Sequence, residues 1–111
     1  MVNSVVLVGR LGTDPELKYS KDGKAIATFR LAVDRRSRRG EEKQTDWLTI
    51  ATFGAVAENC AQYLSSGSLV AVEGQVRSHQ WETDTGEKRS SVEIYGGSVQ
   101  FLDKRRKGDD E

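Results

Sequence analysis

A chain of 111 residues is long enough for one domain with a single hydrophobic core and too short for two. Its seventeen basic and seventeen acidic residues balance, which excludes binding of a polyanion through overall positive charge, so any such site must be a local patch. The single cysteine, Cys60, excludes an internal disulfide and suits a reducing cytoplasm. The opening residues have no basic segment before a short apolar run, so we expect a soluble cytosolic protein with no membrane association.

The first predicted strand, Val5–Leu11, reads VVLVGRL and is apolar on both faces until Arg10. Such a strand is covered on two sides, either by other elements of a barrel or at a subunit contact. The residues that we expect at a subunit contact are Val5, Val6, Leu7 and Val8. Residues 16–20 predict a short second strand, and the Asp22-Gly23 pair after it favours a tight hairpin turn.

The segment Ala25–Asp34 predicts a strand with one apolar face, and Arg30 lies on the opposite face. The apolar face carries Ala25, Ala27, Phe29, Leu31 and Val33. Residues 35–44 follow with four arginines and no periodicity, which is typical of an exposed loop.

The strand Thr45–Phe53, read as TDWLTIATF, alternates between two faces. Leu48 and Ile50 fit a packed interior, whereas the opposite face carries Trp47 and Phe53 with small residues between them. The two rings are separated by roughly 20 Å at about 3.3 Å per residue. Aromatic faces beside a mobile basic segment are what a flexible polyanion with stackable bases requires.

Gly54 opens the only helical pattern, with Val56, Cys60, Tyr63 and Leu64 on one stripe and Gly67 as the expected C-terminal cap. Residues 68–81 predict a further strand, in which Arg77, His79 and Trp81 share the face opposite to Val70, Val72 and Val76.

A turn at residues 83–87 leads to a returning arm with Lys88 and Arg89 at its start. The last predicted strand, residues 92–101, changes parity across Gly96-Gly97, which indicates a β-bulge.

This order predicts an all-β fold with one helix, namely a five-stranded oligonucleotide-binding (OB) barrel with long basic hairpin loops. We expect residues 1–102 to form the domain and the charged residues 103–111 to be a disordered tail. An enzyme is improbable, because one His and one Cys on separate elements offer no nucleophile–base pair, and no cofactor or metal motif occurs.

Several separated segments resemble the bacterial single-stranded DNA-binding protein family, among them TDWLTIATFG and GSLVAVEGQVRSHQWE. The resemblance runs in register over residues 3–102, and only the basic loop diverges freely. It implies an OB barrel that assembles as a homotetramer and coats single-stranded DNA during replication, recombination and repair. It also implies a cytoplasmic, nucleoid-associated protein without a cofactor.

The family's stacking positions fall on Trp47, Phe53 and Trp81. An aromatic residue common in the family near Ser37 is replaced here by an arginine-rich segment, which can contact phosphates or stack on bases. The acidic tip through which family members recruit replication and repair proteins is not present in this chain, so that recruitment is not assigned.

Sequence-independent binding and protection of single-stranded DNA is therefore the expected function, with weak base preference and strong salt dependence. The cations that we expect on phosphates are Arg30, Arg35, Arg36, Arg38, Arg39, Arg77, Lys88 and Arg89. Two alternatives stay open. One is an RNA-binding barrel, and the other is a protein-interaction adaptor whose large rings are buried at contacts. Tyr63 and Phe29 are expected in the core, and Tyr19 and Tyr95 are undecided.

Overall fold

The computed structural model describes residues 1–103, and the predicted disordered tail lies outside this range except for Asp103. The elements in chain order are β1 (Val5–Leu11), β2 (Glu16–Tyr19), β3 (Ala25–Asp34), β4 (Thr45–Phe53), α1 (Gly54–Tyr63), β5 (Leu69–Glu82) and β6 (Lys88–Phe101). The predicted order of strands and one helix is thus confirmed.

The strands form one sheet in the order β1-β5-β6-β4-β3-β2, and a further pairing of β1 with β3 closes five of them into a ring. The closure is short, since β1 meets β3 only at Arg10 and Leu11. The other join is the parallel pairing of β4 with β6 at Ile50 and Ala51. A ring without a long free edge is how a small antiparallel sheet avoids exposing unpaired backbone groups.

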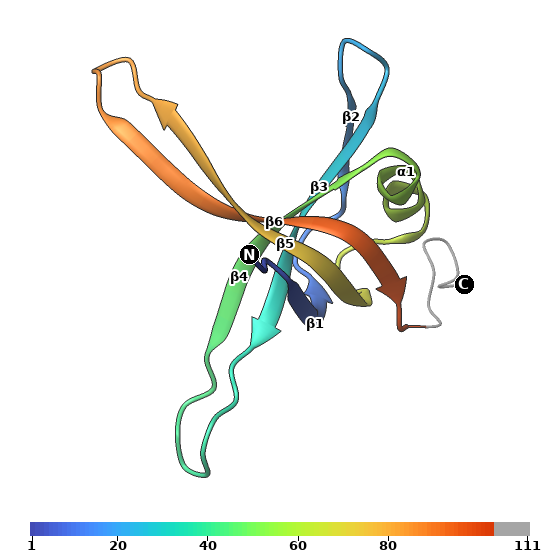
Figure 1. Cartoon of the computed structure of the whole chain (residues 1–111). Coiled ribbons are helices and arrows are strands. Elements are labelled where there is room, and N and C mark those ends of the chain that lie inside the picture. Colours follow the sequence, from blue (N-terminus) through green and yellow to red (C-terminus); the bar gives the residue numbers. More distant parts are fainter. Residues whose placement is uncertain (104–111) are drawn as a thin grey trace.

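Three hairpins project beyond the barrel, as Figure 1 shows. The β3–β4 arm carries the basic loop, and the β5–β6 arm extends to the turn at Thr83 and Gly86, where the backbone of Thr83 bonds that of Glu87. The β2–β3 hairpin turns at Gly23, whose φ of 81° is the left-handed conformation that the Asp-Gly pair predicts. The two long arms leave the barrel in different directions (Figure 1).

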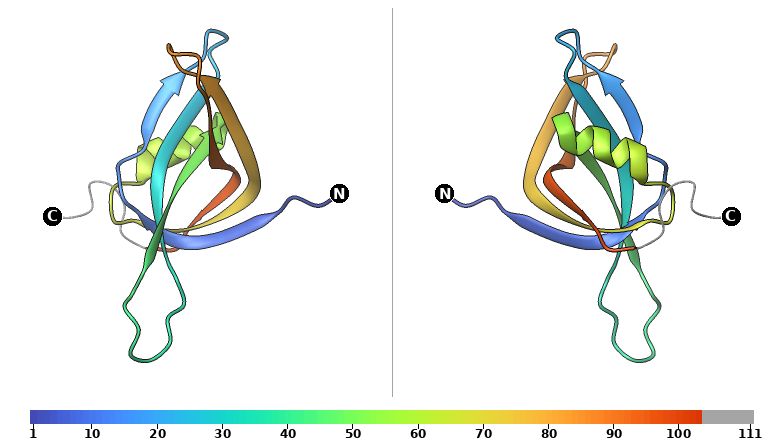
Figure 2. Two further views of the ribbon diagram at one scale, coloured as in Figure 1. Left: turned by 90° about the vertical axis from the view of Figure 1, so that its left-hand side faces the viewer. Right: turned by 90° about the vertical axis from the view of Figure 1, so that its right-hand side faces the viewer.

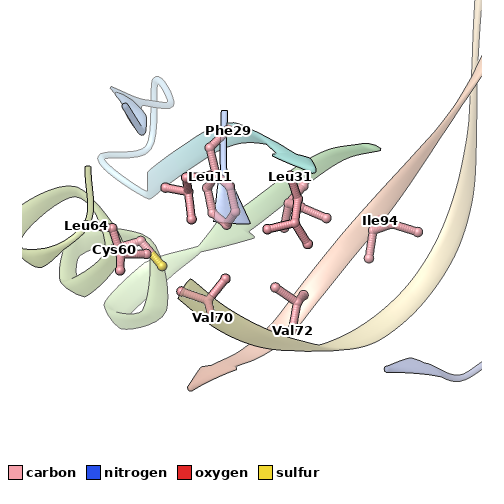
Figure 3. Packing of buried hydrophobic residues seen from close by; sticks show 9 residues of the cluster. Leu11, Phe29, Leu31, Cys60, Leu64, Val70, Val72 and Ile94 are labelled. Atoms are coloured by element: carbon pink, nitrogen blue, oxygen red, sulfur yellow. The ribbon is translucent and has the colours of Figure 1, made fainter. Parts of the chain in front are cut away.

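The core fills the ring with side chains of alternate strand positions, seen in Figure 3. The buried cluster consists of Leu11, Phe29, Leu31, Ile50, Cys60, Leu64, Val70, Val72 and Ile94. Helix α1 lies at one side of the barrel (Figure 2), and Ala57 packs there against Ala25 and Ala27 of β3. Small side chains on both elements allow this close approach.

The prediction that Gly67 caps the helix is wrong. The helix ends at Tyr63, and Leu64 already has extended backbone angles while its N–H bonds the Cys60 carbonyl. Gly67, with φ of 94°, lies instead in the turn that leads into β5, where its N–H donates to the Leu11 carbonyl. Tertiary contact of this turn with β1 therefore overrides the local capping signal.

The expected bulge in β6 is present, because Glu73 pairs with Ser98 and Gly74 with Gly96, which leaves Gly97 without a partner in β5. Val76, predicted on the same face as Val70 and Val72, is exposed, and so is Val92. Both lie where the β5–β6 arm has left the barrel. Phe29 is buried as predicted, whereas Tyr63 is only half-buried. The centroid of the Tyr63 ring lies 6.3 Å from that of Phe101.

The first strand is covered on one face only within this chain. Val5 and Leu7 pack against the core, whereas Val6 and Val8 are 66% and 53% exposed. Just before β1, the side-chain amide of Asn3 donates to the Val76 carbonyl and accepts from the Val76 N–H, at 2.8 and 2.9 Å. The segment ahead of β1 is thereby attached to β5.

Candidate nucleic-acid interface

Trp47 stands on the outer face of β4, as its strand parity predicts, and 54% of its surface is exposed. Its backbone pairs with Ala32 of β3, and its indole lies against Gly12 at the end of β1. On the inner face of the same strand, Ile50 is fully buried. A large ring held on the outside of a barrel wall is unusual, since such rings normally bury most of their area.

Exposed arginines lie on β3 and on the arm that joins β3 to β4, the strand of Trp47. Arg30 is exposed on the outer face, where its backbone pairs with Thr49. Arg36, Arg38 and Arg39 are exposed on the arm, and within residues 1–103 they form no ion pair. These four guanidinium groups are open to an anionic ligand.

Arg35 differs from its neighbours, because its guanidinium is already bound. Its Nε and Nη2 donate to the carboxylate of Asp46 at 2.8–3.1 Å, and its Nη1 donates to the Gln44 side chain at 2.8 Å. The hydrogen bond from Arg35 lowers the pKa of Asp46, and the same bond raises the pKa of Arg35. We name the Arg35–Asp46 pair the hairpin fork. It links the two sides of the β3–β4 arm at its base, next to Trp47.

Trp81 lies near the tip of the β5–β6 arm, 45% exposed, with its ring 5.6 Å from that of His79. Across the hairpin its partner is Arg89, so the indole and this cation share one face. They line a hollow of about 390 Å³ whose other walls are Gln80, Glu82, Lys88 and Ser90. Arg89 also forms an exposed ion pair with Glu87 at 3.1 Å.

Phe53 ends β4 and is half-buried, because its ring stacks on that of Tyr95, with centroids 4.7 Å apart and planes 18° from parallel. The ammonium of Lys24 lies 5.7 Å from the Phe53 centroid, and the guanidinium of Arg77 lies 4.1 Å from the Tyr95 centroid. The three predicted rings therefore lie on outward faces, although Phe53 is more enclosed than the two indoles.

Four residues of this surface are additions to the sequence prediction, namely Gly12, Lys24, Asp46 and Tyr95. Tyr95 had a detectable signal, since it is adjacent to the buried Ile94 and must face outwards. Asp46 and Lys24 had none, because their partners, Arg35 and Phe53, come from other parts of the chain. We use the name ring track for the outward-facing set Trp47, Phe53, Tyr95, Arg77, His79 and Trp81.

Other reactive groups lie apart from the ring track. Cys60 is fully buried, and burial raises the pKa of its thiol to about 11. Within residues 1–103 there is no group of three or more His, Cys, Asp or Glu side chains that could hold a metal ion. No helix in that range is long and apolar enough to cross a membrane.

A closed five-stranded barrel with one helix between β4 and β5, and with exposed rings and cations on its outer strands and arms, defines a protein of the OB-fold class. The chain belongs to the single-strand binding protein family, whose model matches residues 2–102.

Similar proteins agree with this assignment. The chain is 44% identical over 106 residues to the single-stranded DNA-binding protein of Thermotoga maritima, covering 93% of this chain and 75% of that relative. It is 41% identical to single-stranded DNA-binding protein A of Bacillus subtilis, covering 97% of this chain and 63% of that protein. Among solved structures, a Plasmodium falciparum SSB in complex with ssDNA superposes with a TM-score of 0.84 at 30% identity, covering 93% of this chain and 96% of that one.

Proposed function

We propose that this protein binds single-stranded DNA without regard to sequence and protects it during replication, recombination and repair. The observation that carries the proposal is the exposure of two indoles on outer strand faces. Trp47 lies on β4, whose neighbour β3 and the arm between them carry arginines that form no ion pair within residues 1–103, and Trp81 lies beside Arg89. Every base has a flat face that can stack on such a ring, so binding of this kind tolerates any sequence. Family membership and the Plasmodium complex with ssDNA support the same ligand.

The mechanism divides affinity between rings and cations. Bases stack on Trp47, Phe53 and Trp81, while Arg30, Arg36, Arg38, Arg39, Arg77 and Lys88 neutralise phosphates. Arg35 and Arg89 also belong to the predicted set, but each is bound to a carboxylate, so their contribution is smaller. Release of counterions from the phosphates makes the affinity fall steeply with salt.

The proposal assigns binding and no catalytic step to this chain. The only cysteine is buried with its thiol protonated at neutral pH, which makes it a poor nucleophile. The only histidine, His79, stacks beside Trp81 on an exposed strand, where it extends the aromatic surface.

We further propose that the protein is a homotetramer in which the outer face of β1 contributes to a subunit contact. Val6 and Val8 are exposed and are paired with Glu73 and Ala71 of β5. Of the four residues predicted at the contact, Val5 and Leu7 pack against the core, so Val6 and Val8 carry the proposal. Exposed apolar side chains that adjoin on a sheet face are typical of association sites.

Residues 1–102 are proposed to constitute the DNA-binding domain. Such a protein acts in the cytoplasm, at the nucleoid, where single strands arise. Partners among replication and repair proteins are expected for the family.

The test is a titration with oligo(dT) that follows tryptophan emission at two salt concentrations. We expect strong quenching at low salt and weaker binding at high salt. Loss of affinity in Trp47→Ala and in Trp81→Ala, by roughly 1–3 kcal/mol for each stacked base, would confirm the role of the rings. An emission spectrum that does not respond to oligo(dT) would contradict the proposal and favour the adaptor, whereas preference for oligo(U) in competition would favour RNA.

A further inference from the structure

Tyr95 occupies the point at which the aromatic surface passes from one strand of the barrel to another. Its strand, β6, lies between β4 and β5 in the sheet. On the β4 side Tyr95 pairs with Ala51, and the ring of Phe53, two residues further on, stacks against it. On the β5 side it pairs with Gln75, and the guanidinium of Arg77, two residues further on, lies over it. Tyr95 is thus enclosed between a ring and a cation from opposite neighbours.

The register of β5 and β6 places this group on the same face as Trp81. From Gln75, which pairs with Tyr95, the side chains of Arg77, His79 and Trp81 follow at every second position. The six residue-to-residue steps from Gln75 to Trp81 correspond to roughly 20 Å along the strand. Phe53 and Trp47 continue the same outer surface along β4. Tyr95 therefore connects the part of the ring track on β4 with the part on β5.

We propose that Tyr95 is a positioning residue for nucleic-acid binding, which holds the Phe53 ring for a base and the Arg77 guanidinium for a phosphate of the same strand. This inference rests on the proposed function. A guanidinium lying on a ring keeps its N–H groups at the edge, where they can donate to phosphate oxygens. With one side of Phe53 covered by Tyr95, a base would stack on the opposite side.

Lys24 fits the same arrangement. It approaches Phe53 from the β3 side, because its neighbours Ala25 and Ile26 begin β3 and Ile26 pairs with Phe53. Its ammonium is 5.7 Å from the ring centroid, and the side chain is exposed and forms no ion pair within residues 1–103. A long exposed lysine can move aside when a base arrives and then contact a phosphate.

The experiment compares affinity for oligo(dT) and its salt dependence in Tyr95→Leu, Tyr95→Phe and Arg77→Lys. Tyr95→Leu removes the ring and should lower affinity about tenfold, with the salt slope reduced by about 0.7, the value for one lost phosphate contact on a single strand. Tyr95→Phe keeps the ring, so its affinity and salt slope should equal those of the unmodified chain. Arg77→Lys keeps the charge but cannot lie flat on the ring, so it should also weaken binding.

A matched control is Val92→Ala, an exposed side chain of β6 on the opposite face from Tyr95. It should bind like the unmodified chain. Thermal unfolding of each variant separates loss of the site from loss of the fold, and Arg77→Lys, an exposed substitution, keeps the test valid if Tyr95→Leu does not fold.

Unchanged affinity and salt slope in folded Tyr95→Leu would overturn the inference, as would unchanged binding by Arg77→Lys. If the unmodified chain binds oligo(dT) and loses affinity in Trp47→Ala, those results refute the role of Tyr95 alone. If the unmodified chain does not bind oligo(dT), the proposed function itself fails.

Discussion

The indole of Trp47 rests on the backbone of Gly12, so closely that a Cβ atom at residue 12 would overlap Cζ3 of the ring. Gly12 does not have a positive φ, so space rather than backbone conformation requires glycine here. Its N–H donates to the Arg30 carbonyl at 2.8 Å, which ties this end of β1 to β3. The orientation of one proposed stacking ring is therefore set by a residue 35 positions earlier in the chain.

Gly12→Ala should displace the Trp47 ring and lower affinity for oligo(dT), because the indole can no longer lie where the glycine admits it. We expect a loss of several-fold, less than for removal of a stacked ring at about 1–3 kcal/mol. The measurement is the same titration, together with the emission maximum of the free protein. Gly97→Ala is the control, since a Cβ there meets only the Glu73 carbonyl oxygen at 3.9 Å. Equal affinities in the two variants would contradict the role of Gly12.

Neutralising Arg36 should reduce the salt dependence of binding more than neutralising Arg35. Arg36 has no ion-pair partner within residues 1–103, whereas Arg35 is bound to Asp46 and Gln44. For Arg36→Gln we expect the slope of log affinity against log salt to fall by about 0.7. The slope for Arg35→Gln should change by less. A larger change in slope for Arg35→Gln than for Arg36→Gln would mean that DNA binding breaks the Arg35–Asp46 ion pair of the hairpin fork.

The hairpin fork should make a small pH-dependent contribution to stability. Arg35 lowers the pKa of Asp46 below its ordinary value of 3.8, so the contribution is present above that value and is lost as the pH falls through the lowered pKa. The difference in free energy of unfolding between the unmodified chain and Asp46→Asn should therefore be constant above roughly pH 5 and shrink below it. Urea denaturation over this range measures it. A difference that stays constant into acid would show that the pair is broken in solution.

Cys60 should destabilise the fold in alkali. Burial raises the pKa of its thiol from 9.0 to about 11, an effect partly offset by a hydrogen bond with Thr52. The unfolded chain then loses a proton that the folded chain keeps, so stability falls between these pH values, by at most about 1.4 kcal/mol per pH unit. Denaturation of Cys60→Ala in parallel isolates this part, because other groups titrate in both proteins. If the free energy of unfolding of Cys60→Ala and that of the unmodified chain changed equally with pH, the prediction would be wrong.

Lysine at Val6 and Val8 should lower the mass of the assembly. Both side chains are exposed on the outer face of β1, and a charged group there would have to be buried at the proposed contact. Sedimentation at micromolar concentration measures the mass. Val92→Lys, at an equally exposed valine on the β5–β6 arm, is the control and should leave it unchanged. A monomeric unmodified chain would refute the contact.

The sequence predicted the barrel, its helix and the outward direction of Trp47 and Trp81, because these depend on period-two alternation within single strands. Even the bulge at Gly97 was visible, as a change of parity. Each of these features is local, so a strand can be interpreted without knowledge of its neighbours.

The contacts between strands could not be predicted in this way. The pairing of Arg35 with Asp46 depends on the register of β3 against β4, and the position of Tyr95 beside Phe53 depends on a parallel pairing of β6 with β4. Gly67 shows the reverse case, in which a clear local signal for a helix cap was overruled by a contact with Leu11. Register and topology are properties of the whole sheet, and for this reason single-sequence periodicity misses them.

The side chain of Asn3 has a consequence for how copies of this protein behave at high concentration. Its amide bonds both backbone groups of Val76, just beyond Gly74, where β1 stops covering β5. An amide side chain thus substitutes for one more residue of a neighbouring strand. Unpaired strand edges pair with strands of other molecules and so promote aggregation. By bonding the backbone of Val76, Asn3 helps to prevent such edge-to-edge pairing where the β5–β6 arm leaves the barrel.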